Sequence, residues 1–271
     1  MTESIAFGDE VVPVDAESVE RANEPIGDLE PLRRLTRLRE LRLVRTNPHV
    51  RLEHFFDDLE PLRELSNLEI VELAHAPVDD LSPLAGLTQL RRLDLSHSQV
   101  SDLAPLAGLT ELRRLDLSSS RVSDLAPLRA LTELEQLDVA WTSVAKLDAL
   151  RELARLEALD VSGTRVVDLG PLRALRALRS FECRGTTVAE LGPLAELTAL
   201  EVLRLAGTKA QDLSPLAGLH GLRELDLTST AVRDLSPLAG LSELRLLLLV
   251  GTPVGDDQVE QLADTVRVLH D

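Results

Sequence analysis

The sequence repeats itself every 22 residues, and this period limits the chain to one kind of architecture. A typical unit, residues 80–101, reads DLSPLAGLTQLRRLDLSHSQVS. Successive units begin at equivalent, mostly acidic positions: Asp28, Asp58, Asp80, Asp102, Asp124, Lys146, Asp168, Glu190, Asp212 and Asp234, with a partial unit from Asp256. A unit this short cannot bury its apolar face alone, so neighbouring units must stack into a solenoid.

Each unit predicts one short strand and one short helical turn. In residues 80–101, Leu93 and Leu95 alternate with polar residues, which is the pattern of a strand with one buried face. Stacked units place such strands side by side in a parallel sheet. The segment around Pro83 suits a helical turn, with Ser82 as a candidate N-cap. Aromatic residues make up 2% of the chain, so the core must be aliphatic.

A column of hydroxyl side chains follows the predicted strands. It occupies one position of the repeat, with Ala76 as the exception. Its members are Thr46, Ser98, Ser120, Thr142, Thr164, Thr186, Thr208, Thr230 and Thr252. Because the chain leaves the strand at this position, buried hydroxyls can satisfy backbone groups that lose their partners. We interpret this column as structural.

The full pattern, LxxLxLxx[T/S]xVxDLxPLxxL, resembles the 22-residue leucine-rich repeats of bacterial internalins. It is also similar to the repeats of the leucine-rich regulatory subunit of protein phosphatase 1. The resemblance covers residues 28–255 and implies an α/β solenoid of the leucine-rich-repeat horseshoe type. Such a fold has a concave parallel β-sheet, short 3₁₀ or helical turns on the convex side, and a ligand, usually a protein, on the concave face. The chain departs from many members in using Thr or Ser where Asn is common.

The repeat boundaries divide the chain into three predicted segments. Residues 1–27 are an acidic N-terminal cap or tail, residues 28–255 the solenoid, and residues 256–271 a C-terminal cap. The first unit is longer than the others, and its extra residues lie around the loop 49–56, which contains two histidines and a Phe-Phe pair. This insertion is either a functional loop or a tolerated surface insertion.

Charge and composition exclude several functions. The formal net charge is −17, which repels a nucleic-acid backbone but is compatible with a protein partner that has a basic surface. No apolar run is long enough for a membrane span, and the first residues lack the pattern of a secretory signal. The single cysteine, Cys183, excludes an internal disulfide and falls at a buried strand position. We therefore expect a cytoplasmic monomer that binds neither membrane nor nucleic acid.

The outward positions of the strands predict an acidic column on the concave face. Its residues are Arg42, Glu72, Asp94, Asp116, Asp138, Asp160, Glu182, Arg204, Asp226 and Leu248. Six consecutive acids at strand spacing repel one another, and Arg92 and Arg114 can relieve part of this. The column is either a solvated face, a surface for a basic partner, or a weak cation site.

A neighbouring column contains Arg45, His75, His97, Ser119 and Trp141, and then mostly glycine. The chain has one tryptophan, and an exposed tryptophan is typical of interface hot spots, although packing on the adjacent turn is the alternative. His75 and His97 should be lateral neighbours. They favour a pH-sensitive contact with a partner, because no metal-binding spacing accompanies them.

The sequence contains no motif of an enzyme, and no cofactor is implied. The leading hypothesis is a non-catalytic scaffold that binds a protein on the concave face. The alternatives are a self-assembling module that uses Leu246, Leu248 and Val250, or a sugar- or cation-binding sensor. The predicted partner-binding residues are Arg45, His75, Arg92, Asp94, His97, Arg114, Asp116, Asp138, Trp141 and Asp160.

Overall fold

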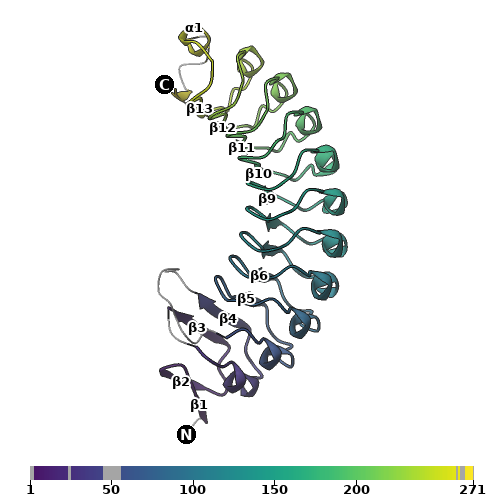
Figure 1. Cartoon of the computed structure of the whole chain (residues 1–271), viewed down its shortest axis with the longest axis vertical. Helices are drawn as coiled ribbons and strands as arrows, with labels where there is room; N and C mark the ends of the chain where they lie inside the picture. Colours follow the sequence, from purple (N-terminus) through teal and green to yellow (C-terminus); the bar gives the residue numbers. More distant parts are fainter. Residues whose placement is uncertain (1–2, 24–25, 45–55, 261, 263–265, 271) are drawn as a thin grey trace. The chain divides into compact units, whose positions relative to one another are not determined.

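The computed structural model describes residues 3–23, 26–44, 56–260, 262 and 266–270 (Figure 1). The chain divides into two compact units, residues 1–138 and residues 139–271, which we call the N-terminal and C-terminal units. In each of them, one strand and one short 3₁₀ helix recur with the period of the sequence. Figure 1 shows the strands of each unit side by side, with the 3₁₀ helices on the opposite side of the core.

The strands of the N-terminal unit follow chain order. A hairpin of β1 (Ser4–Phe7) and β2 (Glu10–Pro13) precedes a parallel sheet. The sheet contains β3 (Ser18–Ala22), β4 (Glu40–Val44), β5 (Ile70–Glu72), β6 (Arg92–Asp94), β7 (Arg114–Asp116) and β8 (Gln136–Asp138). Between them lie η1 (Glu30–Arg34), η2 (Glu60–Leu62), η3 (Ser82–Leu84), η4 (Ala104–Gly108) and η5 (Ala126–Ala130).

The C-terminal unit continues the same alternation. Its parallel strands are β9 (Ala158–Asp160), β10 (Ser180–Glu182), β11 (Val202–Arg204), β12 (Glu224–Asp226), β13 (Leu246–Leu248) and β14 (Arg267–Leu269). Its helices are η6 (Asp148–Leu150), η7 (Gly170–Ala174), η8 (Gly192–Leu194), η9 (Ser214–Leu216), η10 (Ser236–Leu238) and α1 (Asp256–Val259). The predicted solenoid of parallel strands and 3₁₀ turns is confirmed.

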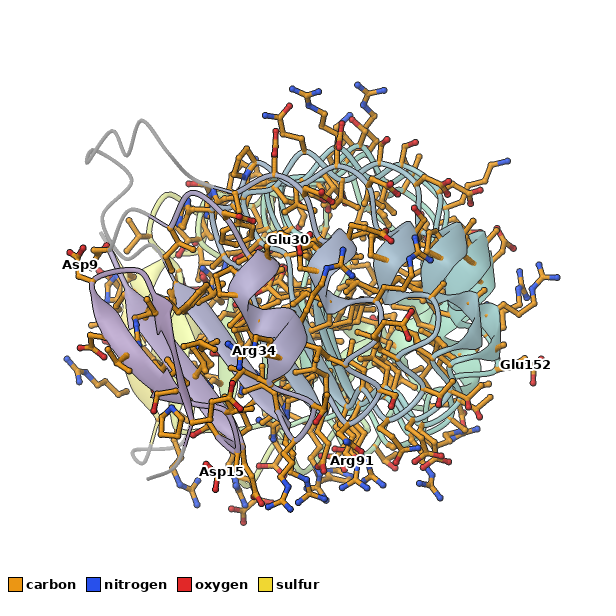
Figure 2. All side chains as sticks on the ribbon, turned by 90° about the horizontal axis from the view of Figure 1, so that it is seen from below. Asp9, Asp15, Glu30, Arg34, Arg91 and Glu152 are labelled. Atoms are coloured by element: carbon orange, nitrogen blue, oxygen red, sulfur yellow. The ribbon has the colours of Figure 1, made fainter. Side chains whose placement is uncertain are left out.

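Equivalent residues of successive repeats lie side by side. Leu93 of β6 pairs with Leu115 of β7, and Asp94 pairs with Asp116. The leucines of each repeat therefore form continuous buried rows, and Leu93 is 1% exposed. Each such side chain contributes roughly 1.5–3 kcal/mol before entropy is subtracted. Charged side chains such as Asp15 and Glu152 point outward into solvent (Figure 2).

The 3₁₀ helices are capped differently from the sequence prediction. Ser82 is the first residue of η3. The N-cap of this helix is Leu81, which makes no side-chain capping hydrogen bond. Instead, the carboxylate of Asp80 accepts hydrogen bonds from the backbone N–H of Ser82 at 2.8 Å and from its hydroxyl at 2.5 Å. The aspartate that opens most repeats orders the turn in this way, because aspartate readily accepts from the N–H two residues later.

The two ends of the chain carry their own elements. In the hairpin, Ile5, Phe7 and Val12 are buried, whereas Val11 is 68% exposed, as alternation along a strand requires. At the other end, β14 pairs with β13 in parallel and adds a last strand to the sheet. The insertion at 49–56 lies outside the described residues except for Phe56, which is buried.

The hydroxyl column forms the predicted ladder. Each threonine Oγ1 donates to the carbonyl of the residue three positions earlier, at 2.6–2.7 Å, and all but Thr252 are buried. The donors are Thr142, Thr164, Thr186, Thr208, Thr230 and Thr252, and Ser120 does the same. Thr46 lies outside the described residues.

Replacing Thr164 by valine keeps the shape but removes the donor to the Val161 carbonyl, which accepts at 2.6 Å. We expect the free energy of unfolding to fall by about 1–3 kcal/mol, since a buried acceptor loses its partner. Urea unfolding followed by circular dichroism measures the loss. Thr164→Ser, which retains the hydroxyl, is the control and should lose less. Equal stability of Thr164→Val and the wild-type protein would contradict the structural role of the ladder.

Candidate functional site

Three residues after each strand from β5 to β13, the backbone is left-handed. In the N-terminal unit these residues are His75, His97 and Ser119, with φ of 65°, 58° and 56°. The N–H of His75 donates to the carbonyl of Ser96, and the N–H of His97 to that of Ser118, both at 2.8 Å. This turn links each repeat to the next. It explains why glycine fills the position in several repeats, because glycine adopts positive φ without penalty.

At the same turn in the C-terminal unit, glycine occupies most of the positions. Gly163, Gly185, Gly207 and Gly251 have φ between 64° and 70°, whereas Trp141 and Ser229 have φ of 59° and 56°. A non-glycine residue in this region costs roughly 1–2 kcal/mol. Such strain persists when the side chain has a function that glycine would not supply. Among the non-glycine residues at this turn, His75, His97 and Trp141 carry aromatic rings, which makes them candidate functional residues.

His75 and His97 form a stacked pair on the N-terminal unit. Their ring centroids lie 4.1 Å apart, and the ring planes differ by 10°. The prediction that they are lateral neighbours is confirmed. No group of His, Cys, Asp or Glu among the described residues has an arrangement that could hold a metal ion.

Asp94 and Asp116 lie beside each other next to this pair. Asp94 accepts from the backbone N–H of Ser96 at 2.9 Å, and Asp116 accepts from Ser118 through the backbone N–H at 2.9 Å and the hydroxyl at 2.7 Å. In the described part of the chain, neither carboxylate forms an ion pair. The row continues to Asp138, which pairs in register with Asp116. We call His75, His97, Asp94 and Asp116 the acidic–histidine surface.

The two arginines expected to relieve this row behave differently. Arg92 pairs with Glu72 at 2.7 Å rather than with Asp94, and Arg42 pairs with the other oxygen of Glu72 at 3.2 Å. Glu72, with a side chain only 12% exposed, is therefore neutralised. Arg114 forms no ion pair among the described residues. Arg92 therefore relieves part of the repulsion in the column, at Glu72, whereas Asp94 and Asp116 have no ion pair among the described residues.

Burial changes the ionisation of the row. It raises the pKa of Asp116, while the hydrogen bonds from Ser118 act in the opposite direction, and the charge of Asp94 raises the pKa further. The nearby His97 acts in the opposite direction and lowers the pKa of Asp116. Asp116 is thus a half-buried carboxylate whose charge is incompletely compensated within the unit.

In the C-terminal unit, Trp141 occupies the turn position equivalent to that of His75 and His97. Its side chain is 68% exposed, and its ring covers Gly163 so closely that a Cβ on Gly163 would lie 2.4 Å from Cε3. The ring therefore needs glycine at this position. The predicted exposure of Trp141 is confirmed. Its role as a hot spot stays a prediction.

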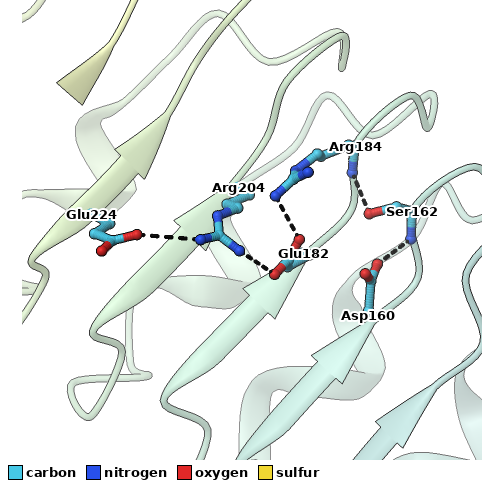
Figure 3. Close-up of polar contacts among 6 residues, drawn as sticks. All are labelled: Asp160, Ser162, Glu182, Arg184, Arg204 and Glu224. Carbon is cyan, nitrogen blue, oxygen red and sulfur yellow. Dashed lines mark hydrogen bonds and ion pairs between the residues drawn. The ribbon is translucent and has the colours of Figure 1, made fainter. Parts of the chain in front are cut away.

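The repeats that follow Trp141 carry an ion-pair network on β10 to β12 (Figure 3). Glu182 pairs with Arg184 at 2.8 Å and with Arg204 at 2.5 Å, and Arg204 also contacts Glu224 at 3.3 Å. Asp160 accepts from the backbone N–H of Ser162 at 2.7 Å. Among the described residues, Asp160 has no cationic partner.

Some predicted site residues fall elsewhere. Arg45 lies outside the described residues, as does most of the insertion. Cys183 is buried, and burial raises the pKa of its thiol to about 12, which agrees with a core residue rather than a reactive one. The partnering of Glu182 and the support of Trp141 by Gly163 were missed by the sequence reasoning. Glycine alternating with His, Ser and Trp at one repeat position was the available signal for positive φ.

Comparison with known proteins identifies the repeat. A family model of two leucine-rich repeats matches residues 88–130. The solved structure of internalin InlF from Listeria monocytogenes strain 4b F2365 aligns with a TM-score of 0.84 and 26% identity, over 96% of this chain and 83% of that one. Internalin C2 of the same strain aligns with a TM-score of 0.59 and 27% identity, over 81% and 85%. The chain is a leucine-rich repeat protein with internalin-like repeats.

Other leucine-rich repeat structures share the fold at lower identity. A plant peptide hormone receptor, RGFR1, in complex with RGF2 aligns with a TM-score of 0.71 and 12% identity, over 96% of this chain and 48% of that one. A search of curated proteins found no match. Leucine-rich repeat folds commonly mediate protein–protein interaction and are generally non-catalytic scaffolds, because stacked repeats present extended surfaces rather than enclosed pockets.

None of the helices described in this leucine-rich repeat protein has both the length and the apolar composition needed to cross a membrane. A cytoplasmic location stays a prediction, as do the monomeric state and the division at residues 27 and 255.

Asp116 and Asp80 form a matched pair for testing the electrostatics of the repeat. Each accepts from the N–H and hydroxyl of the serine two residues later, but Asp116 is half-buried and Asp80 exposed. Because the pKa of Asp116 is raised in the folded state, its contribution to stability is fully present below its pKa in the unfolded chain. That contribution is lost as pH rises through its pKa in the folded state. The hydrogen bonds from Ser82 lower the pKa of Asp80, so its contribution is present at neutral pH and is lost on acidification.

We therefore expect Asp116→Asn to raise the urea midpoint at pH 7 and Asp80→Asn to lower it. Both differences should shrink below about pH 4, near the ordinary pKa of aspartate. Urea unfolding at several pH values between these limits measures them. A lower midpoint for Asp116→Asn than for the wild-type protein at pH 7 would show that its carboxylate is compensated in the fold.

Proposed function

We propose that this leucine-rich repeat protein is a non-catalytic scaffold whose acidic–histidine surface binds a protein partner with a basic surface. The supporting observation is the pair of carboxylates, Asp94 and Asp116, which lie in register and have no ion pair among the described residues. Two like charges at strand spacing repel, and a partner cation relieves that repulsion on binding.

The histidine pair adds shape and specificity to this surface. His75 and His97 hold stacked rings on backbones where glycine would be less strained. Their position beside Asp94 gives the partner an aromatic surface and a row of carboxylates in one place. This combination suits a basic protein surface better than a nucleic acid, because the formal net charge of −17 repels phosphates.

The surroundings restrict which charges the partner can use. Glu72 is already held by Arg42 and Arg92, so it offers little to an incoming cation. Arg114 lies on the same strand as Asp116 and is exposed. A partner that presents a basic residue to Asp94 and Asp116 and an acidic residue to Arg114 would match the surface in both signs.

Charge reversal tests this proposal. Asp94→Arg/Asp116→Arg should weaken partner binding by about ten-fold or more, since attraction becomes repulsion at the contact. The partner is first captured on immobilised wild-type protein and identified by mass spectrometry, and its affinity is then measured with purified components at two salt concentrations.

The matched control is Glu64→Arg/Glu111→Arg, which changes the net charge equally at exposed positions of the same unit outside the strands. The control should retain the captured partner with nearly unchanged affinity. If both double variants bind the captured partner as tightly as the wild-type protein does, the assignment of this surface is refuted.

A second candidate function is self-association through the C-terminal apolar patch, which we define as Leu246, Leu248, Val250 and Leu269. The favouring observation is that Val250 and Leu269 are 43% and 41% exposed on neighbouring segments. Light scattering over a concentration series measures whether the protein self-associates. A monomer mass at every concentration would refute this candidate function, whereas a dimer that Val250→Glu abolishes would support it.

A further inference from the structure

Trp141 combines exposure with a fixed position. Its backbone is held at φ 59°, its N–H donates to the carbonyl of Ser162 at 2.7 Å, and its ring rests against Gly163. The side of the ring over Gly163 is covered by backbone, yet 68% of the residue remains exposed. The protein therefore presents an aromatic face to solvent with little freedom left to lose on binding, which is the property of an interface anchor.

The charge next to this ring is negative and uncompensated. Asp160 accepts from the N–H of Ser162, the residue immediately before Gly163, so its carboxylate lies at the turn on which the Trp141 ring rests. The arginines of the adjoining repeats are engaged with other acids. Arg184 and Arg204 both pair with Glu182 (Figure 3). Within the described residues of this unit, Asp160 is left with a hydrogen bond from the backbone and no cation.

We infer that Trp141 and Asp160 form a subsite for an arginine side chain of the protein partner. A guanidinium is planar and stacks on an indole, while its N–H groups pair with a carboxylate at the edge. The N–H groups of Trp141 and Gly163 donate to the carbonyls of Ser162 and Arg184, so these two groups are not available to the backbone of a partner. The ring and the carboxylate are what the subsite presents to a side chain. This inference rests on the proposed function and adds the chemical identity of one partner residue.

The single tryptophan of the chain reports on this subsite directly. A hexa-arginine peptide carrying a fluorescein label is titrated into the full chain, and binding is followed by the anisotropy of the label. An unlabelled peptide is used to follow the emission of Trp141. We expect saturable quenching and a clear loss of signal when citrulline, which has the same shape without the charge, replaces arginine. Equal quenching by the citrulline peptide would overturn the cation assignment.

A matched pair of glycine variants separates the ring from general electrostatics. Gly163→Ala and Gly185→Ala introduce the same strain, at φ 66° and 64°, and neither changes the charge. Only the alanine at position 163 meets the Trp141 ring, since nothing lies within 4 Å of a Cβ on Gly185. Gly163→Ala should lower the affinity for the peptide by roughly five-fold or more, because it displaces the cation–π partner. Gly185→Ala should lower the affinity by less than about two-fold.

Asp160→Asn completes the test, because the amide oxygen still accepts from Ser162 while the charge is lost. It should weaken the peptide about as much as Gly163→Ala does. Equal affinities of Gly163→Ala and Gly185→Ala overturn the subsite.

The acidic–histidine surface is tested separately with Asp94→Asn/Asp116→Asn. If only this double variant weakens the peptide, the arginine subsite is wrong while the proposed function stands. If Gly163→Ala and Asp160→Asn weaken peptide binding while Gly185→Ala does not, but Asp94→Arg/Asp116→Arg retains the captured partner, the subsite stands and the assignment of the other surface fails.

Discussion

In-register hydrogen bonding between successive repeats is the constraint on which the rest of this structure depends. The N–H of Leu95 donates to the carbonyl of Asp116, and the N–H of His97 donates to that of Ser118. These bonds require the chain to turn with positive φ directly after the strand. Once they form, equivalent side chains of neighbouring repeats lie next to each other, so leucines meet leucines inside and carboxylates meet carboxylates outside.

This constraint has opposite consequences on the two faces of the sheet. Inside, repetition is favourable, because identical leucines fill identical spaces and the threonine hydroxyls satisfy the carbonyls left at each turn. Outside, repetition brings like charges together. The protein neutralises Glu72 and Glu182 with two arginines each, whereas Asp94, Asp116 and Asp160 bond to their own turns and have no ion pair among the described residues. These three carboxylates lie on the surfaces proposed to bind a partner.

The fold could be predicted from the sequence because every repeat gives the same evidence again. Leu93 and its equivalents identify the strand, and the threonine column identifies the turn. The sign of φ at His75 and Trp141 was not foreseen, since a side-chain pattern reports which face a residue occupies but not its backbone torsion. Sequence spacing does not show whether Arg92 pairs with Glu72 or with Asp94. That choice depends on side-chain length and on the geometry across neighbouring strands.

We propose that the partner contacts His75, His97 and Trp141, which accept a left-handed backbone where glycine would be less strained. Hydroxyl-radical footprinting of the protein with and without its captured partner tests this most directly, because histidine and tryptophan side chains are readily oxidised. We predict that oxidation of His75, His97 and Trp141 falls several-fold in the complex, while that of His220, on a turn between strands, is unchanged. Protection confined to Val250 and Leu269, with the three aromatic residues oxidised as in the free protein, would contradict the account.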